Sequence, residues 1–156
     1  MLEVRGDQAL VISKCGLDCK QYNTIQTDVS WETCSLREWL NGTFLNSAFS
    51  MEEQEAIAST IVDNSIEQGS SEQKTWNTGG VNTEDRVFLL SYAEACGYFS
   101  SDSARQCQGT KYAEANGAFM IDRYCGWWLR SAGVIQLFAV HTLPVSAIAE
   151  YTCAFL

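Results

Sequence analysis

Basic residues are scarce in this chain: ten Lys and Arg stand against nineteen Asp and Glu, which gives a formal net charge of −9. Proteins that bind nucleic acid or anionic membrane surfaces need clustered positive charge, so this balance argues against both partners. The sequence has no apolar run near the ~20 residues of a membrane-spanning helix, which argues against membrane insertion. Residues 1–5 also lack the apolar segment of a signal peptide, so the termini leave the localisation unknown.

Histidine and proline occur once each, as His141 and Pro144. Ser-His-Asp and Cys-His catalysis would both have to use His141, which lies in a predicted turn where a solvated role is commoner. A zinc site built on several histidines is excluded. We therefore predict no catalytic residues, no metal site and no cofactor.

Cysteine is plentiful but does not follow a recognisable framework. Seven cysteines cannot all pair within one chain, and Cys15 and Cys19 have no second pair at zinc spacing. Buried or free thiols are the favoured interpretation, and one or two disulfides are the alternative.

Aromatic and aliphatic residues are abundant enough for one domain over residues 1–156 with a core of its own. The centre of that core is predicted at residues 125–131, where Trp127 and Trp128 would point to opposite faces of a strand covered by helices on one side and loops on the other. Arg130 would share the face of Trp128 and pair with a buried carboxylate or carbonyl. Trp31 and Trp39 are also assigned to the core.

Three serines are each followed three positions later by glutamate, a pattern typical of helix capping boxes. They predict helices that begin near residues 35, 50 and 91. The first should bury Leu36, Trp39 and Leu40 and stop at Asn41-Gly42. The second should bury one face and end near residue 59, and the third should end at residue 97. The buried face predicted for the second helix consists of Met51, Ala56 and Ile57.

Apolar runs predict strands at both ends of the chain. Residues 8–13 should pair with residues 3–5 through a turn at Gly6-Asp7. Further strands are expected at 60–63, 86–90, 134–140 and 147–151, and a fourth helix at 110–116. Residues 14–28 and 64–83 are predicted to be connections. Helices in the middle and strands at the ends predict an α+β fold with short helices on a small, mainly antiparallel sheet.

The acidic side chains give no catalytic pair. Glu52, Glu53 and Glu55 begin a predicted helix, where they favour its macrodipole and cap. Glu84 and Asp85 are predicted to be a solvated loop pair.

Several segments in order resemble a bacterial family of domains of unknown function. They include Trp31 to Asn41 (WETCSLREWLN), Phe49 to Glu53 (FSMEE), Asp85 to Ser91 (DRVFLLS) and Trp127 to Ser131 (WWLRS). The resemblance covers nearly the whole chain and implies a C-type-lectin-like fold related in shape to formylglycine-generating enzymes. It also implies a place in surface or secreted bacterial proteins, some of them variable proteins of diversity-generating retroelements.

The chain departs from the family pattern in two places. The family usually extends further at both ends, so we expect that this chain is trimmed there. The family usually has proline at the position of Ala132, and the run after Gly133 is unusually apolar here. Cys125 and Cys153 are the only counterparts of the reactive cysteine pair in formylglycine-generating enzymes, and the motif around that pair is missing.

The resemblance predicts a non-catalytic module that binds a protein or another ligand through residues near the C-terminus. A rigid scaffold with exchangeable side chains suits such binding. The alternatives are a divergent thiol enzyme and a structural spacer domain of a surface protein. The oligomeric state remains unknown. The predicted ligand-binding residues are Val134, Ile135, Gln136, Leu137, Phe138, His141, Thr142, Leu143 and Tyr151.

Overall fold

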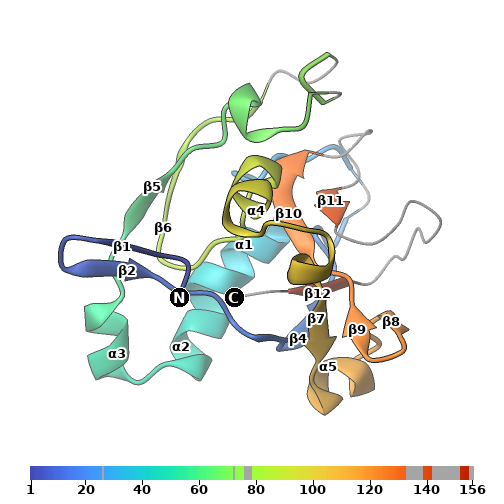
Figure 1. Cartoon of the computed structure of the whole chain (residues 1–156). Coiled ribbons are helices and arrows are strands. Elements are labelled where there is room, and N and C mark those ends of the chain that lie inside the picture. The colour runs from blue at the N-terminus through green and yellow to red at the C-terminus, as the bar shows by residue number, and fades with distance from the viewer. Residues whose placement is uncertain (26, 72, 76–78, 133–138, 142–151, 155–156) are drawn as a thin grey trace. The chain divides into compact units, whose positions relative to one another are not determined.

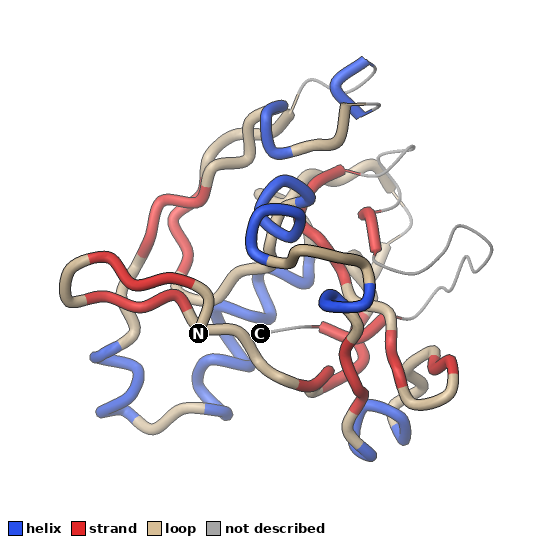
Figure 2. Tube along the Cα trace, in the orientation of Figure 1, coloured by secondary structure: helices blue, strands red, loops and turns tan. Residues whose placement is uncertain are grey.

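A computed structural model describes residues 1–25, 27–71, 73–75, 79–132, 139–141 and 152–154. The fold is α+β, with short helices and small, mainly antiparallel sheets (Figures 1 and 2). The described chain forms two compact units, and each unit is assembled from separate stretches of sequence. Unit 1 contains residues 1–20, 95–128 and 141–156, and unit 2 contains residues 21–94 and 129–140.

Unit 1 begins with the predicted hairpin. Strands β1 (Glu3–Arg5) and β2 (Gln8–Leu10) pair antiparallel, and Gly6 adopts the positive φ of 63° that the turn needs. The strand predicted at 8–13 is shorter than expected, and Val4 and Val11 are exposed. The connection predicted at 14–28 is wrong in part, because it contains the strands β3 (Cys15–Gly16) and β4 (Asp18–Lys20). Both are too short and too polar to give a periodic signal.

The largest sheet of unit 1 has the strand order β3-β7-β9-β8. Its other members are β7 (Cys107–Gly109), β8 (Met120–Ile121) and β9 (Tyr124–Cys125). Strand β4 pairs antiparallel with β12 (Thr152–Ala154). The predicted fourth helix is confirmed as α5 (Lys111–Ala115), which Thr110 caps and Gly117 closes with a φ of 90°. A 3-10 turn, η4 (Ser103–Arg105), precedes β7.

Both adjacent tryptophans are buried, as predicted. Trp127 is 1% exposed, and its Nε1 donates to the carbonyl oxygen of Arg105 at 3.0 Å. Trp128 begins β10 (Trp128–Ala132), and its Nε1 donates to the carbonyl oxygen of Lys20 at 2.9 Å. Each indole therefore buries its apolar ring and satisfies its N–H on backbone. In the described residues β10 pairs with β11 (Ala139–His141) alone, so the central position predicted for this strand is not observed there.

Unit 2 contains the helices predicted near residues 35 and 50 and the start of the helix predicted near residue 91, with corrections. Helix α1 (Ser35–Trp39) continues through a π-helical turn, η1 (Leu40–Phe44), into α2 (Leu45–Ala48), so the predicted stop at Asn41-Gly42 is wrong. The reason is that the side-chain oxygen of Asn41 accepts hydrogen bonds from the backbone N–H groups of Arg86 and Val87, a tertiary role that needs no helix end. Leu36 and Leu40 are buried as expected, whereas Trp39 is only half-buried.

The three proposed capping boxes have different outcomes. The box at Ser50 and Glu53 is confirmed in α3 (Met51–Ala56), but Met51 is 82% exposed and the predicted buried face is wrong. Ser91 and Glu94 exchange the same two bonds ahead of α4 (Tyr92–Tyr98). The box at Ser35 is wrong, because its hydroxyl accepts instead from the N–H of Thr24.

The remaining elements of unit 2 are β5 (Thr60–Val62), which pairs antiparallel with β6 (Thr83–Asp85) as Figure 1 shows, and the 3-10 turns η2 (Ile66–Gln68) and η3 (Gln73–Thr75). The strand predicted at 86–90 is wrong, since these residues form a connection after β6, although Leu89 and Leu90 are buried. None of the described helices has the length and apolar character that a membrane crossing requires.

Candidate functional site

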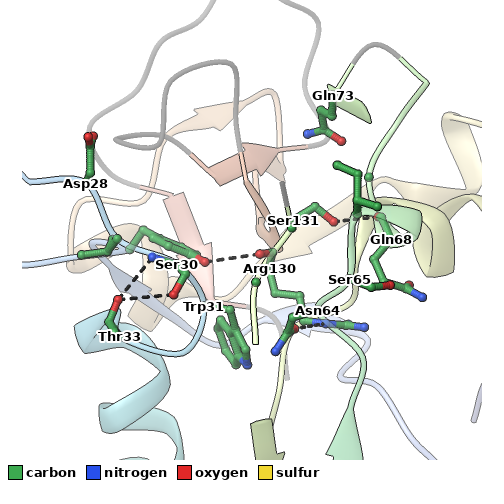
Figure 3. Close-up of a pocket in the computed structure, with 16 residues that line it drawn as sticks. Asp28, Ser30, Trp31, Thr33, Asn64, Ser65, Gln68, Gln73, Arg130 and Ser131 are labelled. Atoms are coloured by element: carbon green, nitrogen blue, oxygen red, sulfur yellow. Dashed lines mark hydrogen bonds between the residues drawn. The ribbon is translucent and has the colours of Figure 1, made fainter. Parts of the chain in front are cut away.

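Unit 2 contains a polar pocket of about 300 Å³ (Figure 3). Its walls come from three stretches that are far apart in sequence: residues 22–33, residues 64–80 and the residues Arg130 and Ser131 of β10. Figure 3 shows Ser30 and Thr33 on one side and Ser65 and Gln68 on the other, with Arg130 and Ser131 between them. The volume lies at the lower end of the range for small-molecule sites.

Arg130 is fixed beneath this pocket by hydrogen bonds from every N–H of its guanidinium group. Its Nη1 and Nη2 donate to both carboxylate oxygens of Glu94 and to the carbonyl oxygens of Leu89 and Asp63, and its Nε donates to Asn64 Oδ1 at 3.1 Å. A guanidinium has five N–H donors, so none is left for a ligand. The predicted role of Arg130 as a structural partner of a carboxylate and of carbonyls is confirmed.

The wall opposite Ser30 is held by amide side chains. Asn64 Nδ2 donates to the carbonyl oxygen of Val81 at 2.9 Å and to Thr83 Oγ1 at 3.1 Å. The side chain of Gln68 donates to Asp63, and its backbone carbonyl oxygen accepts a hydrogen bond from the hydroxyl of Ser131 at 2.9 Å. The sequence predicts residues 64–83 to be a connection, and these bonds fix Asn64 and Gln68 within it.

Gly79 closes this wall. A Cβ atom on Gly79 would lie 2.4 Å from the backbone nitrogen of Ile66, and its φ of 74° suits glycine. Backbone therefore meets backbone here without room for any side chain.

The second wall begins at Tyr22 and Trp31. Burial raises the pKa of Tyr22 well above its usual range, so its hydroxyl stays protonated and donates to the carbonyl oxygen of Arg130 at 3.4 Å. Trp31 is 2% exposed and donates through Nε1 to Asp85 Oδ2 at 2.9 Å. Neither group is arranged for proton transfer at neutral pH.

Asp85 organises the layer beneath Trp31. The predicted solvated loop carboxylate is wrong, because Asp85 is 1% exposed. It accepts from Trp31, from Arg37 Nε at 2.6 Å and from Thr83 Oγ1 at 2.7 Å, with Asn41 Nδ2 at 3.3 Å. A buried carboxylate that accepts from this many donors fixes the elements that supply them.

The pocket wall has few charged side chains. Among the described residues that line it, Arg130 and Asp28 are charged; Arg130 is paired with Glu94, and Asp28 is an exposed carboxylate. The other polar groups are hydroxyls and amides. Within the described residues, no three His, Cys, Asp or Glu side chains lie close enough together to bind a metal ion.

The described thiol in the same unit as this pocket is Cys34, and it is not an accessible nucleophile. Burial raises the pKa of the Cys34 thiol to about 11, and its Sγ lies 3.4 Å from the carbonyl oxygen of Trp31. Cys125 is 2% exposed and belongs to unit 1. Cys153 lies in β12, opposite Cys19 in the register.

The ligand-binding residues predicted near the C-terminus cannot be compared with this site. His141 ends β11, and the others lie outside the described residues. Ser131, at the pocket, precedes Val134 by three positions in the chain. Sequence reasoning missed the pocket itself, because its three stretches share no local motif. Only the prediction of Arg130 as a structural anchor pointed towards it.

Comparison with known proteins decides the family. A family model described as "Domain of unknown function (DUF6273)" matches residues 6–151. The chain belongs to this family. No curated protein and no solved structure matches it. The family's description assigns no activity, so function has to be argued from the pocket.

Proposed function

We propose that this DUF6273 domain is a non-catalytic binding module whose pocket in unit 2 holds a small, uncharged, polar ligand. The observation that carries the proposal is the internal neutralisation of Arg130. All five N–H donors of the Arg130 guanidinium are already used within the protein, so an anionic ligand gains no ion pair with this side chain. The hydroxyl and amide groups that line the pocket suit hydroxyl or amide groups on a ligand.

The burial of Cys34, Cys107 and Cys125 supports a module without catalysis. A thiol enzyme needs a thiolate that its substrate can reach, and Cys125 is enclosed between strands. A charged thiol reagent distinguishes the two functions, because rapid reaction of native Cys125 or Cys153 would favour an enzyme.

Saturation-transfer NMR tests the proposed binding with a panel of uncharged disaccharides and of blocked, uncharged dipeptides. The same compounds bearing a phosphate or carboxylate serve as the charged comparison. We expect transfer to members of the uncharged set and recovery of those compounds unchanged after long incubation. Preferential binding of the charged set, or conversion of a bound compound, would contradict the proposal.

Two phenylalanine variants tie binding to the pocket. Ser65→Phe places a ring at the wall of the pocket and should abolish the transfer. Ser47→Phe places the same ring on an exposed part of α2 in the same unit and should leave the transfer intact. Both variants should melt close to the wild type, and binding that survives Ser65→Phe places the ligand elsewhere.

The family resemblance supports a finer proposal, in which a C-type-lectin-like scaffold presents residues 134–151 as a variable surface. Ser131 links the pocket directly to that stretch in the sequence. Sibling genes from one locus provide the test. Differences confined to residues 134–151 would favour a retroelement-diversified protein, and differences spread evenly over the chain would contradict it.

A further inference from the structure

Two cysteines of unit 1 face each other across a pair of strands. Cys107 in β7 lies directly opposite Cys125 in β9 in the antiparallel register. Their Sγ atoms are 3.4 Å apart, and both are thiols in this structure. Directly opposed residues of antiparallel strands have Cα atoms about 4.5 or 5.5 Å apart, and both values fall within the range that a disulfide spans.

We propose that Cys107 and Cys125 are a disulfide-forming pair, oxidised while the domain folds. A sulfur–sulfur bond is about 2.0 Å long, so the two atoms have to approach by roughly 1.4 Å. Rotation about the side-chain bonds suffices for this approach, because the backbone already holds the two residues in register.

A metal site is the other use for adjacent thiols. Structural zinc takes four ligands, commonly cysteine and histidine. Among the residues that the structure describes, no group of three His, Cys, Asp or Glu side chains is placed to hold a metal ion, and the pair itself supplies two ligands. The geometry therefore favours oxidation over metal binding.

The chemistry is thiol–disulfide exchange with a low-molecular-weight disulfide such as oxidised glutathione. The thiolate of one cysteine attacks a sulfur of glutathione disulfide, which forms a mixed disulfide and releases one glutathione thiolate. The second cysteine thiolate attacks the protein sulfur of that mixed disulfide and displaces the second glutathione. The two protons lost by the cysteines end on the two released glutathione molecules, and two glutathione thiols replace one disulfide.

Burial of the two cysteines determines at which stage of folding this reaction can take place. Cys107 is 4% exposed and Cys125 is 2% exposed, so glutathione cannot reach either sulfur once β7 and β9 have paired. Exchange is expected before that pairing is complete, and the finished bond is then shielded from reductants. Folding in an oxidising compartment is the condition that such a bond requires.

Peptide mapping of the whole chain tests the pair. The reduced, denatured protein is refolded either in mixed reduced and oxidised glutathione or in a phosphine reductant, then alkylated and cleaved with trypsin without reduction. Cleavage after Arg105, Lys111, Arg123 and Arg130 places Cys107 and Cys125 in separate peptides, each with no other cysteine. We expect the two peptides to be linked after refolding in glutathione and separate after refolding in the reductant.

Thermal unfolding of alanine variants gives an independent measurement. The wild type refolded in glutathione should melt at a higher temperature than the wild type refolded in the reductant, and Cys125→Ala should melt at the same temperature after either refolding. The matched control is Cys96→Ala, which removes an exposed thiol and should behave as the wild type. The peptide map of the wild type remains decisive if Cys125→Ala fails to fold.

Three results would overturn the proposal. One is that both peptides carry alkylated thiols after refolding in glutathione. Another is that either peptide is linked to a different cysteine peptide. The last is that Cys107 or Cys125 retains glutathione as a stable mixed disulfide.

Discussion

The two units of this domain hold their interiors together by different means. Unit 2 buries two charged side chains, Arg130 and Asp85, within its apolar core, and each is surrounded by hydrogen-bond partners. Unit 1 relies on indole packing, with Trp127 against Phe99, and on a pair of adjoining thiols. Buried charges are costly to desolvate, and removing one partner leaves the other charge without compensation. The comparison predicts that single polar substitutions should damage unit 2 most and that oxidation should stabilise unit 1.

The largest effect is expected from Glu94→Gln. The substitution keeps the shape of Glu94 but directs an amide NH₂ towards the guanidinium of Arg130, whose side chain is 1% exposed. Breaking one side of a buried ion pair costs about 3–5 kcal/mol, and we expect about 3 kcal/mol because the Glu94 side chain is itself 29% exposed. Urea denaturation monitored by tryptophan fluorescence measures the loss.

A double-mutant cycle with Arg130→Met completes this test. Removing both charges should cost clearly less than the sum of the two single losses, because no buried charge is left without a partner. Strict additivity would show that Glu94 and Arg130 act independently, which would contradict the claim that their ion pair stabilises unit 2.

The next largest loss in the free energy of unfolding is expected from Asp85→Asn. Asparagine offers one acceptor where Asp85 accepts from Trp31, Arg37 and Thr83, and it leaves the charge of Arg37 uncompensated. We expect a loss of about 2–3 kcal/mol, since hydrogen bonds to charged groups are worth about 1.5–3 kcal/mol. Arg37 is partly exposed and can regain water, which keeps the loss below that for Glu94→Gln.

The matched control for Asp85→Asn is Asp102→Asn in unit 1. Asp102 also pairs with an arginine, Arg105, but its side chain is 98% exposed. Exposed ion pairs contribute about 0–1 kcal/mol, so this variant should unfold nearly as the wild type does. Equal losses at the two sites would remove the distinction between buried and exposed charge on which the comparison depends.

The proposed disulfide gives unit 1 an effect of similar size in the opposite direction. The loop that it would close runs from Cys107 to Cys125, near the ~15-residue loop for which the chain-entropy account gives about 3 kcal/mol. The stability of unit 1 should therefore depend on redox conditions. Unit 2 contains one described cysteine, Cys34, whose raised pKa makes its thiol a poor nucleophile.

Features governed by neighbouring residues were predictable from sequence. The hairpin at residues 3–10 depends on the turn at Gly6, and the caps at Ser50 and Ser91 depend on glutamates three positions later. These signals need no knowledge of the rest of the fold. The burial of Trp127 and Trp128 was also predictable from neighbouring residues, because two adjacent indoles present a large apolar area whose burial is favourable.

Features that depend on remote partners were not predictable. Asp85 meets Arg37 and Trp31 from 48 and 54 positions away, so nothing near it distinguishes it from a solvated carboxylate. Asn41 followed by glycine has the pattern of a helix end, yet its side chain binds backbone beyond residue 85. The candidate pocket was missed for the same reason, since its walls meet only in the folded unit.

The smallest predicted effect compares one helix cap from each unit. Ser50 caps α3 on an exposed surface, whereas Thr110 Oγ1 accepts from the N–H of Ala113 and also donates to the carbonyl oxygen of Leu17 at 3.2 Å. Removing a cap costs about 0.5–2 kcal/mol, so we expect Ser50→Ala near the lower end and Thr110→Ala near the upper end. Thr110→Ser keeps the hydroxyl and should recover most of the loss in urea denaturation. If Ser50→Ala costs as much as Thr110→Ala, the second bond to Leu17 adds nothing, and unit 1 depends on its packing alone at this helix.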